Sequence, residues 1–213
     1  MDATWYRDIN NFAVHTSWLH EPGKVFAVYA VGLFGLAVLA AWWYARSRPD
    51  PVRPVAACIW AAAGTLIAVA VNQPITHAVA RPRPYLTLHH VEVLVARSQD
   101  FTFPSDHATT AGAAAAGLWI VARYGGRAAR NLAIAATVLA LLIAFARVYV
   151  GAHYPGDVAA GLALGATITV VGWLILARPL NALTRWVRDR TPLRPLVSAV
   201  GTAPSAGAVK MSR

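Results

Sequence analysis

The chain has 213 residues, of which 57% are hydrophobic and 13% charged, and its mean hydropathy is +0.48. Because soluble domains contain about 45–50% apolar residues, this composition argues against a soluble protein. The formal net charge of +10 fits either a nucleic-acid surface or the basic cytoplasmic loops of a membrane protein. Cys58 is the single cysteine, which excludes an intrachain disulfide and a metal site built from cysteines.

The first segment, residues 1–24, mixes charged and aromatic side chains and lacks the pattern of a cleaved signal peptide. Its aromatic residues are Trp5, Tyr6, Phe12 and Trp18, and Trp and Tyr side chains are typical of headgroup depth. We therefore predict a short interfacial helix in this segment.

Apolar runs dominate the rest of the chain. A helix needs roughly 20 residues to cross a hydrocarbon core about 30 Å thick. Five runs approach or exceed this length, at residues 25–45, 55–80, 107–122, 131–146 and 158–177. They predict an all-α fold, a polytopic membrane helical bundle of about five to six transmembrane helices.

Three parts follow from these runs: the N-terminal segment 1–24, a membrane domain over 25–177, and a basic tail over 178–213. The tail ends in a Gly-, Ala-, Ser- and Pro-rich stretch that we expect to be disordered. In the last span, Gly161 and Gly165 have the spacing that lets two helices pack closely.

The basic residues are unevenly distributed. Loops 46–54 and 123–130 and the tail 178–213 hold 13 of the 19 Lys and Arg residues. Alternating five spans places all three segments on one side, which the positive-inside rule makes cytoplasmic, with the N-terminus outside. Because the charge is spread over several short loops, the pattern argues against a nucleic-acid partner.

Two polar stretches interrupt the apolar sequence, at residues 103–107 and 147–157. The same alternation puts both on the outer face, together with the long loop 81–106. Polar groups at the rim of a membrane segment are costly to keep there, so their convergence indicates a functional site.

The residue types in these stretches suit phosphate chemistry. The candidates are Arg81, Arg83, Ser105, Asp106, His107, Arg147, His153 and Asp157. Arginine presents a rigid fork of donors to phosphate oxygens. Ser105 or Asp106 can cap a helix that begins at His107, and a helix N-terminus binds anions.

The histidines complete the chemistry. Asp157 can hold one tautomer of His153 and leave the other ring nitrogen free to attack. A second histidine, His107, can protonate the leaving oxygen. These residues predict phosphoryl transfer through a covalent phosphohistidine, without a metal or another cofactor.

Simpler interpretations compete with this one. A histidine at a membrane rim is usually a polar residue in the headgroup layer, and Asp157 alone could be a helix cap. A metal site could be drawn from His89, His90 and Glu92, or from His153 with Asp157, but neither spacing matches a zinc pattern. The occurrence of all these groups on one face favours the catalytic interpretation.

The motifs resemble those of the type 2 phosphatidic acid phosphatase family. That family has a Lys separated by six residues from Arg-Pro, then Pro-Ser-Gly-His, then Ser-Arg, five residues, His, three residues and Asp. The corresponding residues are Arg83-Pro84, Pro104 to His107, and Arg147, His153 and Asp157. The resemblance implies a helical membrane phosphatase with His153 as nucleophile, Asp157 as its partner and His107 as acid. It further implies phosphate binding by Arg83, Ser105 and Arg147.

Three positions depart from the family pattern: Thr76 stands in place of Lys, Asp106 in place of Gly, and Ala146 in place of Ser. We expect Thr76 and Asp106 to face the phosphate, and Arg81 or His77 to replace the missing cation. The Pro-Ser-Asp-His variant resembles the branch that dephosphorylates undecaprenyl diphosphate, a lipid carrier of bacterial cell-wall synthesis.

We therefore expect a multi-pass protein of the bacterial inner membrane whose site faces outward and whose C-terminus is cytoplasmic. Its expected substrate is a polyprenyl diphosphate within the bilayer. Two alternatives are a phosphatase for phosphatidate, phosphatidylglycerophosphate or another lipid phosphate, and a non-enzymatic protein that binds or transports anionic lipids.

Overall fold

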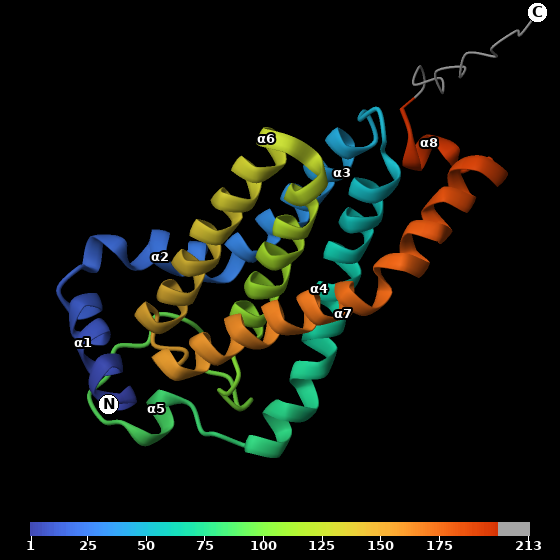
Figure 1. Cartoon of the computed structure of the whole chain (residues 1–213). Helices are drawn as coiled ribbons and strands as arrows, with labels where there is room; N and C mark the ends of the chain where they lie inside the picture. The colour runs from blue at the N-terminus through green and yellow to red at the C-terminus, as the bar shows by residue number, and fades with distance from the viewer. Residues whose placement is uncertain (200–213) are drawn as a thin grey trace, which may run out of the picture.

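A computed structural model describes residues 1–199, and this part of the chain is built from helices without strands (Figure 1). Three helices are long: α4 (Val52–Val79), α6 (Asp106–Tyr149) and α7 (Pro155–Arg190). The other elements are α1 (Asp2–Val14), η1 (Ser17–Leu19), α2 (His20–Tyr29), η2 (Ala30–Gly32), α3 (Leu33–Ala45), α5 (Pro84–Thr87) and α8 (Arg194–Val197).

The longest helix, α6, turns back on itself at Gly126 (Figure 1). Gly126 has φ 76° and ψ −160°, a backbone conformation that residues with a Cβ rarely adopt. The predicted spans 107–122 and 131–146 are therefore the two antiparallel halves of one helical hairpin.

Four helical stretches are long and apolar enough to cross a membrane: Ser17–Ala45, Val52–Thr87, Asp106–Tyr149 and Pro155–Arg190. With α6 divided at Gly126, they correspond to the five predicted spans and confirm the polytopic helical bundle. Pro74 lies inside α4 without ending it, and the helix stops only at Ala80, which adopts a left-handed conformation.

The core of the bundle consists of α4, α6 and α7, which pack on one another through small side chains. Ala56, Ala57 and Ala111 are fully buried there, which lets the helix backbones approach closely. The indole N–H of Trp60 on α4 donates to the carbonyl of Thr169 on α7 at 2.8 Å. Many large apolar side chains, such as Leu66, Leu174 and Ile175, are exposed instead, as expected of a surface that faces lipid.

The glycines of α7 contact α6 where close packing was predicted. A Cβ at Gly161 would lie 2.7 Å from the carbonyl oxygen of Ser105, and one at Gly165 would overlap the carbonyl oxygen of Thr109. Small residues are therefore required at this crossing, where the second and third turns of α7 meet the start of α6.

We expect Gly165→Ala to lower the free energy of unfolding. Ala is favoured over Gly in a helix by about 1 kcal/mol, but forced overpacking of a core costs typically about 1–3 kcal/mol. Because the added Cβ would clash with backbone atoms, the overpacking cost should lie at the upper end of that range. After the helix-propensity gain is subtracted, the net loss of stability is about 1–2 kcal/mol. Thermal unfolding of the detergent-solubilised protein measures the change.

Gly35→Ala is the matched control, because a Cβ at Gly35 meets no other described atom within 4 Å. It should leave the unfolding temperature unchanged or raise it slightly. Equal unfolding temperatures for the two variants would contradict the close α6–α7 contact.

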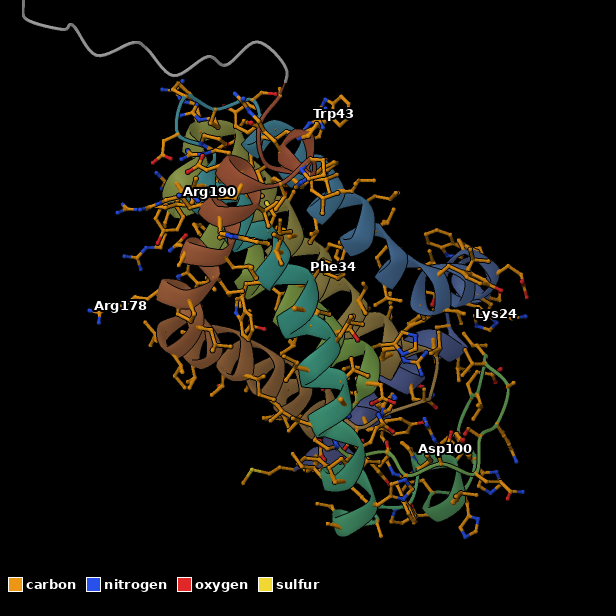
Figure 2. All side chains as sticks on the ribbon, turned by 90° about the vertical axis from the view of Figure 1, so that its right-hand side faces the viewer. Lys24, Phe34, Trp43, Asp100, Arg178 and Arg190 are labelled. Atoms are coloured by element: carbon orange, nitrogen blue, oxygen red, sulfur yellow. The ribbon has the colours of Figure 1, made fainter. Side chains whose placement is uncertain are left out.

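The two ends of the bundle differ in character. The loop 81–105, helix α1 and the starts of α6 and α7 gather at one end, and the Gly126 turn and α8 lie at the other (Figure 1). In Figure 2, Asp100 lies at the first end and Arg190 towards the second. Both predicted polar stretches are therefore at the same end of the molecule, away from most of the basic residues.

The tail begins as a continuation of α7, which runs past residue 177 through Pro179 to Arg190. Short helix α8 then returns to α3, where the Trp42 indole N–H donates to the carbonyl of Leu196 at 2.9 Å. The stretch predicted to be disordered at the C-terminus lies mostly outside the described residues.

Candidate active site

A cavity of about 450 Å³ opens where the polar stretches meet. Its lining residues are Gln73, Thr76, His77, Arg83, Ser98, Gln99, Asp100, Phe101, Pro104, Asp106, His107, Arg147 and His153. Six predicted site residues are among them. Of the other three, Ser105 and Asp157 are fully buried, and Arg81 is partly exposed outside the lining.

His153 lies in the turn between α6 and α7 and is 3% exposed. Its Nδ1 is 2.9 Å from the carbonyl oxygen of Thr102 and 3.0 Å from the Thr102 hydroxyl. The carbonyl can only accept, and the hydroxyl already donates its proton to Asp157 at 2.6 Å. Nδ1 of the neutral ring must therefore carry the proton, which leaves Nε2 with a free lone pair.

Asp157 supports His153 indirectly. The two side chains were expected to be hydrogen-bonded, but Nδ1 is 3.9 Å from the nearer carboxylate oxygen, too far for such a bond. Thr102 fills the gap by contacting both residues. The local spacing of His153 and Asp157 predicted their proximity, whereas no sequence pattern marked Thr102, which lies in a long loop.

The pKa of the His153 imidazole is well below its ordinary value. Burial is the main cause, and the nearby cations Arg147 and Arg83 add to it by disfavouring a charged ring. A neutral imidazole at neutral pH is the form that can act as a nucleophile.

Two arginines approach His153 from different elements. Arg147, near the end of α6, directs a guanidinium N–H at His153 Nε2 over 3.4 Å and another at the carbonyl of Ala27 over 3.4 Å. Arg83 donates to the carbonyls of Asp100 at 2.9 Å and Ala152 at 3.1 Å. Each arginine has five N–H donors, so backbone contacts orient both while leaving donors for an anion.

His107 lies in the first turn of α6 and lines the same cavity. Ser105 is the N-cap residue, but its side chain makes no capping hydrogen bond. Its hydroxyl oxygen and the Nε of Arg147 are buried without a hydrogen-bond partner within residues 1–199. Buried polar atoms are normally paired, which makes these two atoms candidate partners for a bound group.

Asp106 and Thr76 occupy one wall of the cavity. One oxygen of Asp106 accepts from the side-chain amides of Asn72 at 2.6 Å and Gln73 at 2.9 Å. The hydroxyl of Thr76 donates to the carbonyl of Asn72 at 3.0 Å. Asn72 and Gln73 were not predicted, although two adjacent amides inside an apolar span are a detectable signal.

Arg81 lies beside the cavity lining and is bonded to two carboxylates. It was predicted to bind phosphate, but its guanidinium bonds to the carboxylates of Asp157 and Asp2 and stacks over the Tyr154 ring at 4.0 Å. Both terminal nitrogens of Arg81 thus have carboxylate partners, and Arg81 does not line the cavity. Asp2, from the first turn of the chain, was missed.

The rival metal site is not assembled. Within residues 1–199, no three His, Cys, Asp or Glu side chains group closely enough to hold a metal ion. The groups that do converge are two arginines and two histidines around an open cavity. This arrangement places two cationic side chains beside a neutral imidazole, in a cavity at one end of a membrane-spanning helical bundle.

Comparison with known proteins identifies the class. The family model described as the PAP2 superfamily matches residues 57–180, more than half of the chain. The chain belongs to the PAP2 superfamily and is an integral membrane phosphatase.

Individual relatives agree with this assignment. Undecaprenyl-diphosphatase BcrC of Bacillus subtilis (strain 168) is 28% identical over 200 residues, covering 94% of this chain and 90% of that protein. The fold is similar to that of the crystal structure of a transmembrane PAP2-type phosphatidylglycerolphosphate phosphatase from Bacillus subtilis, with a TM-score of 0.58. That alignment has 20% identity and covers 84% of this chain and 86% of the other. Aquifex aeolicus LpxE has a TM-score of 0.54, with 22% identity and coverage of 81% and 94%.

Proposed function

We propose that the protein hydrolyses a polyprenyl diphosphate, with undecaprenyl diphosphate as the natural substrate, to the lipid monophosphate and inorganic phosphate. The observation that supports the chemistry best is His153, held by Thr102 with its free Nε2 beside Arg147 in a cavity shared with His107. The choice of lipid is supported by the similarity to BcrC along nearly the whole chain.

In the first step, the lone pair of His153 Nε2 attacks the terminal phosphorus. The bond between that phosphorus and the bridging oxygen breaks, and His107 gives its proton to the departing lipid monophosphate. A bound diphosphate places negative charge near His107 and thereby favours its protonated form. Arg83 and Arg147 stabilise the charge on the transferring group.

In the second step, water attacks the phosphohistidine. His107 now removes a proton from that water, and the P–N bond breaks to release inorganic phosphate and free His153. Both proton transfers use the same histidine, so the enzyme returns to its starting state. Within this scheme Asp157 and Thr102 keep the proton on Nδ1, and the buried hydroxyl of Ser105 donates to a phosphate oxygen.

The orientation in the membrane is part of the proposal. The site end of the bundle is poor in basic residues, and the opposite end carries the Gly126 turn, loop 46–54 and the basic end of α7. The positive-inside rule makes that opposite end cytoplasmic. The cavity then opens to the outer leaflet of the bacterial inner membrane.

A lipid panel tests the substrate. Detergent-purified protein is given undecaprenyl diphosphate, phosphatidate or phosphatidylglycerophosphate in the presence of EDTA, and phosphate release is followed. We expect activity without added metal, with kcat/KM at least about tenfold higher for the diphosphate, a preference that corresponds to roughly 1.4 kcal/mol of transition-state binding.

Two results would overturn this proposal. A higher kcat/KM for one of the monoester lipids would assign a different substrate. Binding of all three lipids without release of phosphate would favour a non-enzymatic lipid-binding protein. A His153→Ala preparation, purified in parallel, corrects for contaminating phosphatases.

A further inference from the structure

The Asp157 carboxylate is fully enclosed by hydrogen-bond donors. One oxygen accepts from the Thr102 hydroxyl at 2.6 Å and from the Tyr154 backbone N–H at 2.8 Å. The other oxygen accepts from a terminal guanidinium nitrogen of Arg81. Asp157 is 0% exposed, whereas the Arg81 side chain is 30% exposed, so Arg81 connects a buried group to the surface.

Arg81 is in turn fixed by the N-terminal helix. Its other terminal nitrogen donates to Asp2 at 2.7 Å, and the second oxygen of Asp2 accepts from the backbone N–H of Gly156 at 2.8 Å. The plane of the guanidinium lies over the Tyr154 ring. Asp2 therefore joins α1 to the first turn of α7, the turn that also carries Asp157.

We propose that Asp2 and Arg81 are positioning residues for His153 and make the N-terminal helix part of the active site. The chain of contacts runs from Asp2 to Arg81, to Asp157, to Thr102 and to Nδ1 of the imidazole. This inference rests on the proposed role of His153 as nucleophile. It assigns functions to two residues that lie outside the cavity lining.

The geometry explains why an arginine is needed at position 81. A guanidinium can bond two carboxylates at once through separate nitrogens in a fixed plane, whereas an ammonium is a single point charge. With Arg81 in place, Asp157 has one orientation, and the Thr102 hydroxyl has one acceptor. A displacement of about 1 Å at a reacting atom can cost about 100-fold in rate. If Asp157 and Thr102 lost these fixed positions, kcat should therefore fall measurably.

The prediction separates positioning from phosphate binding. Asp2→Asn and Arg81→Gln should lower kcat on the lipid diphosphate by about 10- to 100-fold. The inhibition constant of inorganic phosphate should stay within about twofold of wild type, because neither residue touches the phosphate site. Arg81→Lys should recover only part of the loss. The double variant should lose no more than Arg81→Gln alone, since both residues act through one chain.

Asp8→Asn is the matched control, because Asp8 is exposed on the same helix. It should behave as wild type. Unfolding temperatures in detergent verify that each variant is folded, and if Arg81→Gln fails to fold, Asp2→Asn alone decides.

Three outcomes are informative. Equal activity of Asp2→Asn and Asp8→Asn would overturn the inference. In Arg81→Gln, the inhibition constant of phosphate could instead rise by the same factor as kcat falls. That result would mean that Arg81 binds phosphate directly. The wild-type protein in the same assay tests the proposed function separately. If it releases no phosphate from any of the lipids, the proposed function is refuted.

Discussion

Replacing His153 with alanine is expected to reduce phosphate release from the lipid diphosphate to background. The imidazole Nε2 is the atom that forms the covalent bond to phosphorus in the proposed mechanism, and the contacts of Nδ1 with Thr102 keep the lone pair on Nε2. Loss of a catalytic nucleophile costs roughly 10⁴- to 10⁶-fold in kcat. Steady-state assays of the detergent-purified variant measure the effect.

His89→Ala is the control for this experiment. His89 is an exposed histidine at the same end of the molecule, in the loop that precedes α6. It should retain wild-type activity, and that result would count against the rival metal site that includes it. Near-normal turnover by His153→Ala would refute the nucleophile assignment.

Replacing His107 with glutamine should have the second largest effect, and the size should depend on the leaving group. General acid catalysis contributes roughly 10²- to 10⁴-fold when the departing oxygen needs a proton. Hydrolysis of an aryl phosphate should slow much less, because its leaving group departs as a stable anion and does not need the proton. The measurement is the ratio of kcat values, wild type to variant, for the lipid diphosphate and for p-nitrophenyl phosphate.

The same two substrates distinguish the role of His107 from that of His153. His153→Ala should lose activity on both, because the nucleophile is needed whatever departs. If His107→Gln loses activity equally on both, then His107 contributes through binding or packing and the acid role is wrong.

The fold could be predicted largely from the sequence because the bilayer restricts the alternatives. A chain whose apolar runs match the membrane thickness must form helices there, since lipid offers no hydrogen bonds to the backbone. The turn within α6 falls inside the predicted loop 123–130, and the spacing of Gly161 and Gly165 predicted a close helix contact. What the pattern did not show is that α7 continues to Arg190, because basic residues are compatible with a helix that leaves the membrane.

The site was predictable where its residues are close in sequence. Arg147, His153 and Asp157 lie within a short stretch that crosses the turn between α6 and α7, so the chain itself keeps them close. Thr102 is 51 residues from His153, and its contact depends on how the long loop folds back. No periodicity encodes such a contact.

Arg81 shows how much a residue's partners depend on the tertiary fold. An arginine beside a phosphate site was expected to bind phosphate, but Asp2, 79 residues away, and Asp157 take both ends of its guanidinium. The charge of an arginine is evident in a sequence, whereas its partners depend on the tertiary fold. The partners of Asp106 likewise depend on the fold, since one of its carboxylate oxygens accepts from Asn72 and Gln73 on α4.

The most direct test of the mechanism is a single-turnover experiment with excess enzyme and a polyprenyl diphosphate labelled on its terminal phosphate. After rapid quenching in alkali, which preserves phosphohistidine, the labelled peptide is identified by mass spectrometry. The mechanism predicts transient label on His153, formed at a rate no slower than kcat, and none in His153→Ala. Label on another residue, or full turnover without labelled protein, would contradict a phosphohistidine at this position.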